Sequence, residues 1–351
     1  MNRFILLPPE RQRAIYEEAQ ARRGLPAQSI EKDFWVCWTL RELFAEAAWG
    51  CHLTFKGGTS LAKAWKLIER FSEDIDLVID REHLGFAGPT LSNNQQTKLK
   101  AECSRRIHAE LKPTLESRFR GLIPADRSWT LTGASAAEDV DQQTLLFHYP
   151  TVFPTLSAYL RPVVKMEMGA RSQTEPSAPA PIQSYVAEVF PDLVRDHTFS
   201  IRTVAARRTF LEKALLLHEE TYRPTPAGGA PLRKLGLARH YYDLHRLIEN
   251  GVAEEAVADQ GLLEQVVEHR RIFFRYSWMD YATMQRGSIR LVPLPEQIDA
   301  WRQDYAAMRA EMFFGAAPEF DVILQTVEEF CRQMNASAAA AHTQVNKGRP
   351  T

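Results

Sequence analysis

Cysteine is scarce in this 351-residue sequence, and neither sign of charge is in excess. Cys37, Cys51, Cys103 and Cys331 are far apart and form no CxxC or Cys/His spacing, which disfavours a disulfide framework and a zinc site. We expect reduced core thiols in a cytoplasmic protein. Lysine plus arginine (43) nearly balances aspartate plus glutamate (44), so no global field attracts nucleic acid or an anionic membrane.

Long apolar runs are also missing. The apolar run at 4–7 ends at Pro8 and is too short for a signal peptide, and no stretch approaches the roughly 20 residues that span a bilayer. We therefore expect no membrane association. Walker A, GxGxxG and GxSxG motifs are absent, which disfavours P-loop, Rossmann and hydrolase interpretations.

Strand-like alternation is confined to the first part of the chain. The predicted strands lie at 51–56, 74–79, 128–132, 144–149, 161–168 and 182–190. Two N-terminal helices and two further helices are predicted, the latter at 59–70 and 94–119. Three prolines predict a surface loop at 172–181.

Helical periodicity dominates the second part. The predicted helices lie at 204–222, 237–249, 260–276, 296–312 and 319–335. We therefore expect an α+β domain with N-terminal helices at 1–202, a helical domain at 203–335 and a flexible tail at 336–351.

Two short segments predict a metal and phosphate site. Residues 55–61 spell FKGGTSL, a glycine-rich turn that enters a helix, where backbone N–H groups favour phosphate. Asp74 and Asp76 follow on one face of a predicted strand of Ile, Leu and Val, and like charges there repel unless cations pair with them. Carboxylate oxygens suit Mg²⁺, which usually binds one or two carboxylates plus substrate phosphates.

The run FKGGTSLAKAWKLIERFSEDIDLVI resembles the nucleotidyltransferase AbiEii/AbiGii toxin family, a branch of the polymerase-β-like superfamily. The resemblance implies that Asp74 and Asp76 hold Mg²⁺ or Mn²⁺, with Glu167 in VVKMEMGAR as the third ligand. Lys165, on the same strand face, is alternatively only an ion-pair partner of Glu167. The residues implied to contact the phosphates of a nucleoside triphosphate (NTP) are Gly57, Gly58, Thr59, Ser60 and Ser72.

Two helical segments are similar to family segments farther along the chain. Residues 208–213 (RTFLEK) imply that Lys213 binds the triphosphate. Residues 239–244 (RHYYDL) imply that Asp243 orients Lys213 or acts as a base, although RHY departs from the usual start of that segment. Alternatively, Asp243 pairs with Arg239 one turn earlier.

The resemblance implies a polymerase-β-like nucleotidyltransferase domain with a mixed sheet, followed by a helical C-terminal half. It implies an enzyme that transfers a nucleotide from an NTP to an RNA acceptor, in particular tRNA 3′ ends. It also implies the toxin of a toxin–antitoxin or phage-defence (abortive infection) pair, with the antitoxin encoded by a neighbouring gene. Two alternatives stay open: nucleotidylation of a protein partner, and a catalytically silent nucleotide- or RNA-binding regulator.

Overall fold

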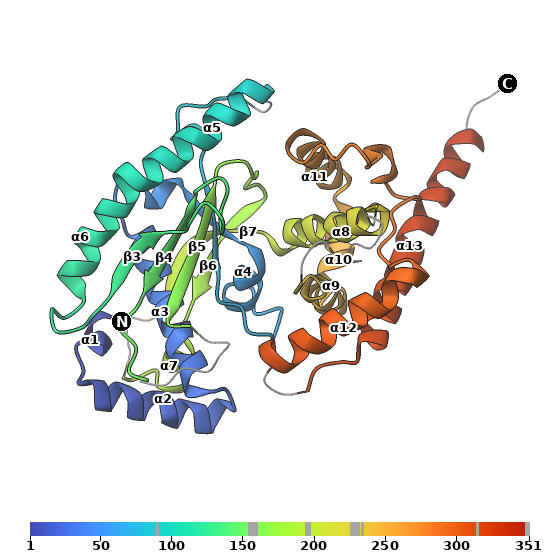
Figure 1. Cartoon of the computed structure of the whole chain (residues 1–351). Helices are drawn as coiled ribbons and strands as arrows, with labels where there is room; N and C mark the ends of the chain where they lie inside the picture. The colour runs from blue at the N-terminus through green and yellow to red at the C-terminus, as the bar shows by residue number, and fades with distance from the viewer. Residues whose placement is uncertain are drawn as a thin grey trace. The chain divides into compact units, whose positions relative to one another are not determined.

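The computed structural model describes most of the chain (Figure 1). The described residues are 1–88, 91–153, 161–193, 198–224, 232, 235–313 and 316–347. The chain forms two compact units. The first comprises Met1–Lys66 and Phe71–Val204, and the second comprises Leu67–Arg70 and Ala205–Thr351.

The first unit is built on a seven-stranded sheet in the order β3-β4-β5-β2-β1-β7-β6. β1 pairs antiparallel with β2 and parallel with β7, and β2 pairs parallel with β5. The predicted α+β class with a mixed sheet is therefore confirmed. The strands are β1 Leu53–Lys56, β2 Ile75–Ile79, β3 Thr130–Gly133, β4 Thr144–His148, β5 Val163–Gly169, β6 Ser177–Ile182 and β7 Phe199–Val204.

Alternation along the strands gives the sheet one apolar face and one polar face. In β5, Val164 and Met166 are fully buried, whereas Lys165 and Glu167 on the other face are partly exposed. Helices α3 (Ala27–Phe44) and α6 (Lys112–Leu122) supply aromatic side chains to the apolar face. The ring contacts there are Trp35, Trp38 and Phe119 with Phe147 of β4.

The remaining helices of the first unit frame this sheet (Figure 1). They are α1 Asn2–Ile5, α2 Pro9–Arg23, a 3-10 turn Gly50–His52, α4 Gly57–Lys63, α5 Asn93–Arg106, a π-helical turn Ile107–Leu111 and α7 Tyr185–Val189. The predicted N-terminal helices and the long helix near 94–119 are confirmed. The helix predicted at 59–70 was too long, because Lys66 adopts a positive φ of 55° that a helix cannot continue through.

The prediction for 172–190 was wrong. Part of the predicted loop is strand β6, and the predicted strand at 182–190 contains helix α7, which Ser184 caps by accepting a hydrogen bond from the Ala187 N–H. β6 lies at the sheet edge, where Pro179 and Pro181 are tolerated because only one side of the strand is paired. The adjoining strand β7 was not predicted.

The second unit is helical. Its helices are α8 Ala206–Tyr222, α9 Arg239–Glu249, α10 Val252–Ala258, α11 Gln260–Phe273, α12 Pro295–Met312 and α13 Phe320–Lys347. α9 packs against α8, α10 and α13, and Tyr241 on α9 contacts Trp301 and Phe320. α10 was not predicted. The backbone of α13 is helical through Lys347 within the predicted tail 336–351, whose last residues lie outside the described part.

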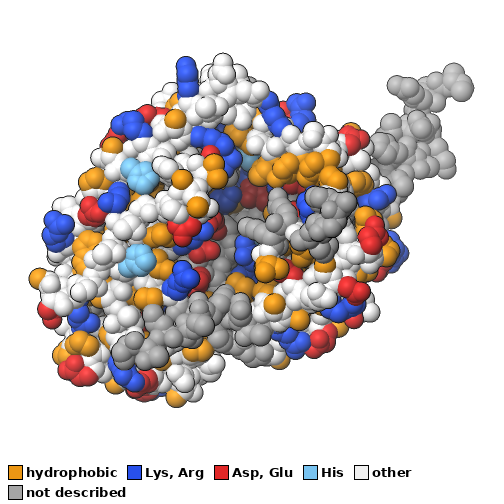
Figure 2. Space-filling model, viewed as in Figure 1, with side chains coloured by type: hydrophobic (Ala, Val, Ile, Leu, Met, Phe, Trp, Pro, Cys, Tyr) orange, Lys and Arg blue, Asp and Glu red, His pale blue; other side chains and the backbone are white. Residues whose placement is uncertain are grey.

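The positions of the charged side chains and of most cysteines agree with what the sequence predicts. Lys, Arg, Asp and Glu side chains are interspersed on the face shown in Figure 2. The four cysteines are free; Cys37, Cys103 and Cys331 are buried, but Cys51 is exposed, so the core prediction was wrong for that residue. Within the described ranges, every helix is too short or too polar to cross a bilayer.

Glu31 is one of several buried charged residues on α3. Its carboxylate accepts hydrogen bonds from the Thr151 hydroxyl at 2.6 Å and the Val152 N–H at 2.7 Å. Burial raises the pKa of Glu31 to about 7 in spite of these hydrogen bonds. The folded protein therefore binds the Glu31 proton more tightly than the unfolded chain does. The stability that this proton contributes is lost as the pH rises from the ordinary pKa of 4.5 to about 7.

Glu31→Gln should flatten the pH dependence of stability. Between pH 5 and pH 8 the wild type should lose about 2 to 3 kcal/mol through ionisation of Glu31, a loss that a neutral amide cannot undergo. Urea unfolding of both proteins at the two pH values measures this. Identical pH dependence in the two proteins would show that Glu31 does not carry the effect.

Candidate active site

The glycine-rich turn brings backbone against a carboxylate. β1 ends at Lys56, and Gly57 opens α4 with a φ of +80°. A Cβ atom built on Gly57 would lie 2.0 Å from Oδ2 of Asp76 on the neighbouring strand. Ser60 closes the turn by donating its hydroxyl hydrogen to the Gly57 carbonyl at 2.8 Å. Glycine is therefore required at position 57 for both conformation and space.

Two hydroxyls fix the backbone where the carboxylates begin. The Thr59 hydroxyl donates to the Asp74 carbonyl at 2.5 Å and lies 2.9 Å from the Ser72 hydroxyl. Because Thr59 has a single hydroxyl hydrogen, Ser72 is the donor between the two. Both side chains thus position the entry to β2. Contact of Thr59, Ser72 and Gly58 with the phosphates of an NTP stays a prediction.

The carboxylates lie on the polar face of the sheet. Asp76 on β2 is the register partner of Glu167 on β5, and Asp74 lies two positions before Asp76. The Lys165 ammonium forms an ion pair with Glu167. Burial lowers the pKa of Lys165, but Glu167, Asp74 and Asp76 together raise it above its usual value. Lys165 is therefore a cation among the three predicted ligands.

The chemistry of this cluster fits a divalent cation bound together with substrate. Among the described residues, no group of three His, Cys, Asp or Glu side chains is arranged to hold a metal ion by itself. Mg²⁺ usually needs only one or two carboxylates, because phosphate oxygens and water complete its shell. The in-register pair Asp76 and Glu167 meets that need. Metal binding by Asp74, Asp76 and Glu167 stays a prediction.

The second unit holds a separate buried cluster around Asp243 on α9. Arg70 binds both carboxylate oxygens, with Nε 2.7 Å from Oδ1 and a terminal nitrogen 2.9 Å from Oδ2. Lys213 on α8 lies 2.9 Å from Oδ2 and 3.3 Å from Nδ1 of His240. The structure thus brings Lys213 and Asp243 together, as the resemblance implies. The arginine that binds both oxygens of Asp243 is Arg70, not the alternative partner Arg239.

The charges around Asp243 favour an orienting role. Burial by itself would raise the pKa of Asp243, but Arg70 and Lys213 lower it well below the usual range. A carboxylate held so firmly in its ionised form is a poor general base. Sequence reasoning missed Arg70, although it belongs to the RFSEDID run, because its partner lies 173 residues away.

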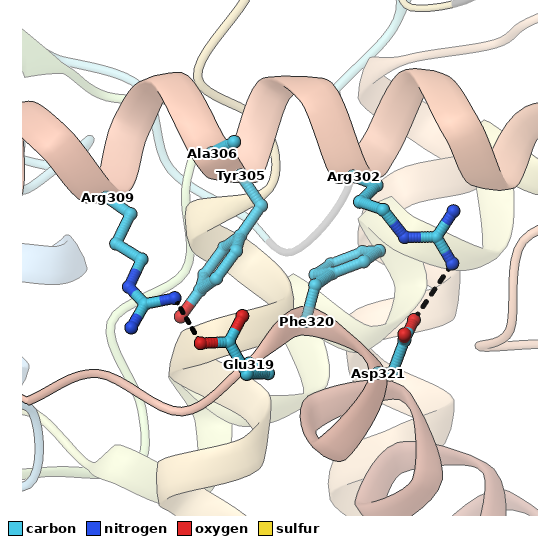
Figure 3. A pocket seen from close by; sticks show the side chains of 7 residues that line it. All are labelled: Arg302, Tyr305, Ala306, Arg309, Glu319, Phe320 and Asp321. Atoms are coloured by element: carbon cyan, nitrogen blue, oxygen red, sulfur yellow. Dashed lines mark hydrogen bonds and ion pairs between the residues drawn. The ribbon is translucent and has the colours of Figure 1, made fainter.

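A surface groove in the second unit carries no comparable site. Arg302, Tyr305 and Arg309 of α12 face Phe320 of α13 (Figure 3). Both arginines are already paired, Arg302 with Asp321 at 3.0 Å and Arg309 with Glu319 at 2.6 Å. The charges there are balanced by neighbours, so nothing in this groove calls for a charged ligand.

The glycine turn thus lies against Asp76, the register partner of Glu167, on a mixed sheet. The profile of the family described as "Nucleotidyl transferase AbiEii toxin, Type IV TA system" matches residues 38–326. This chain belongs to that family. It is therefore a toxin nucleotidyltransferase of a type IV toxin–antitoxin system, and the family implies an antitoxin partner.

Solved structures show a further similarity. The chain is similar to MenT4, a nucleotidyltransferase toxin from Mycobacterium tuberculosis H37Rv, with 17% sequence identity and a TM-score of 0.43. The similarity covers 95% of this chain and 99% of that chain. No curated protein matches the sequence.

Gly57→Ala should abolish most nucleotidyl transfer while the protein stays folded. The new Cβ must displace the Asp76 carboxylate. Misplacing a catalytic group by about 1 Å costs about a hundredfold in rate. Gly24→Ala is the matched control, because Gly24 also has a positive φ of 70° but no atom within 4 Å of a built Cβ. Transfer rates and thermal unfolding of both variants test this; equal activity in the two would contradict it.

Asp243→Asn should destabilise the second unit by about 3 to 5 kcal/mol, because it leaves Arg70 and Lys213 buried without their anion. Glu249→Gln makes the same chemical change on α9, but its side chain is 44% exposed, so the expected cost is below about 1 kcal/mol. Denaturant unfolding of the two variants measures the difference. A loss below about 1 kcal/mol in Asp243→Asn as well would mean that the buried cluster contributes little.

Proposed function

We propose that this protein transfers a nucleotide from an NTP to an RNA acceptor, with tRNA 3′ ends as the first candidate. The observation that carries the proposal is the register pairing of Asp76 with Glu167 beside the Gly57 turn. Phosphoryl chemistry asks the protein mainly to hold the phosphates and to neutralise developing charge. Backbone at a glycine turn and clustered carboxylates are suited to those two tasks.

In the proposed reaction an acceptor hydroxyl oxygen bonds to the α-phosphorus of the NTP. The bond from that phosphorus to the bridging oxygen breaks, pyrophosphate leaves, and the hydroxyl proton passes to water. Asp74, Asp76 and Glu167 would hold Mg²⁺ or Mn²⁺, which when bound offsets the negative charge of the phosphates. Gly57 lets the turn approach closely, and Thr59 with Ser72 keeps the entry to β2 in place.

Lys165 and Lys213 enter the proposal in different ways. Lys165 is an ion-paired cation, so it stabilises anionic groups and does not serve as a base. Lys213 is proposed to bind triphosphate, as the resemblance implies, with Asp243 orienting its ammonium at 2.9 Å. We also propose a cytoplasmic location, because NTP and tRNA are both found there. A role in phage defence is proposed because the family resemblance implies it.

Asp76→Asn should reduce transfer at least about a hundredfold, because it removes a charge from the cation site without changing side-chain size. The purified protein is incubated with Mg²⁺, each labelled NTP in turn and total RNA, and RNA is then separated from protein. Asp80→Asn is the control, since Asp80 follows directly after β2 and faces His52 and Arg202.

Label in small RNA that disappears in Asp76→Asn and persists in Asp80→Asn is the expected result. Label in protein would instead indicate nucleotidylation of a protein partner. Absence of label from both fractions, with RNA binding retained, would favour the silent regulator.

A further inference from the structure

A pocket of about 580 Å³ opens on the polar face of the sheet in the first unit. Its floor comes from β4 and β5, where Leu146 pairs with Lys165 and His148 pairs with Val163. Asp74 also lines this pocket. A volume of this size is typical of sites for small ligands or for one end of a larger one.

The position of this pocket relative to the carboxylates is informative. Sheet order places β2, with Asp76, between β1 on one side and β5 followed by β4 on the other. The Gly57 turn approaches Asp76 from the β1 side, whereas the pocket lies over β4 and β5. In-line displacement requires the attacking oxygen and the leaving pyrophosphate on opposite sides of the α-phosphorus. If the turn holds the phosphates, the acceptor approaches from the pocket.

The pocket lining identifies the acceptor by chemistry. Arg161, Lys165 and His148 supply cationic or hydrogen-bond-donating groups, and Glu138 supplies a carboxylate. Ser135 holds that carboxylate in place, donating to Oε2 from its N–H at 3.0 Å and from its hydroxyl at 2.8 Å. A ligand that carries both a phosphate and free hydroxyls satisfies both sets of groups.

Two further charged side chains at this pocket pair with each other. Lys32 and Glu73 form an ion pair at 2.7 Å, and the Lys32 side chain is only 3% exposed. Arg161 is exposed at the pocket, where the hydrogen bonds from Ser135, and then the charges of Lys165 and Arg161, lower the pKa of Glu138. A serine or threonine hydroxyl of a protein brings no anion to such a cation, whereas the last nucleotide of an RNA brings a phosphate together with its ribose hydroxyls.

We propose that this pocket binds the 3′-terminal ribonucleotide of the RNA acceptor, with Arg161 on its phosphate and Glu138 on its ribose hydroxyls. The inference rests on the proposed function, because it names the place where the acceptor of that reaction binds. It also assigns Arg161, His148 and Glu138 to acceptor recognition, a role distinct from those of the carboxylates.

Arg161→Ala should raise the KM for RNA about tenfold or more and leave the KM for NTP unchanged, since it removes one charge-assisted contact to the acceptor. Arg161→Lys keeps the charge and should recover part of the loss. Arg120→Ala, at an exposed position on α6, is the matched control and should change neither KM. Thermal unfolding verifies that each variant is folded.

The outcomes separate this inference from the proposed function. RNA labelling by the wild type with an unchanged KM for RNA in Arg161→Ala would overturn the acceptor pocket alone. A raised KM for NTP instead would assign the pocket to the donor and likewise overturn the inference. A wild type that labels protein and no RNA would overturn the proposed acceptor and this inference with it.

Discussion

Repulsion between carboxylates on neighbouring strands is the constraint around which the first unit is organised. Parallel pairing of β2 and β5 puts Asp76 and Glu167 side by side, with Asp74 two positions away. Lys165 compensates part of that charge in the structure described. Holding like charges together costs stability, which the packing of α3 and α6 on the opposite, apolar face offsets. An arrangement of this kind is understandable when a cation and phosphate are to be bound.

The two charged clusters follow opposite electrostatic designs. Around Asp76 the carboxylates are partly exposed, Lys56 is the register partner of Asp76, and Lys165 pairs with Glu167. Around Asp243 two cations surround one fully buried anion, which ties Arg70 to α8 and α9 within the second unit. The first cluster suits binding and the second suits positioning. Mutations in the first cluster should therefore lower activity, whereas mutations in the second should lower stability as well.

The sequence predicted those parts of the fold in which local pattern and tertiary environment agree. Apolar and polar residues alternate at 74–79 and 161–168 because one sheet face is buried there, and both strands formed. β6 was missed because its prolines are acceptable only at a sheet edge, and edge position depends on the whole topology. α10 was missed because a seven-residue helix gives too short a periodic signal.

The candidate site was predictable in composition and less so in geometry. Motif resemblance selected Asp74, Asp76, Glu167 and the glycine turn, and the structure places the turn on the β1 side of Asp76 and Glu167 on the β5 side. Spacing alone could not show that Gly57 must lack a Cβ, since that depends on the approach of Asp76. Nor could it identify Arg70 as the partner of Asp243, because no local pattern encodes a contact of such long range.

Calorimetric titration of an NTP into the protein, with and without Mg²⁺, tests the central claim most directly. The account predicts that NTP binds only when Mg²⁺ is present, that Asp76→Asn loses this binding, and that Asp80→Asn retains it. Equal NTP affinity without a divalent cation, or undiminished affinity in Asp76→Asn, would contradict the assignment of these carboxylates to a metal and nucleotide site.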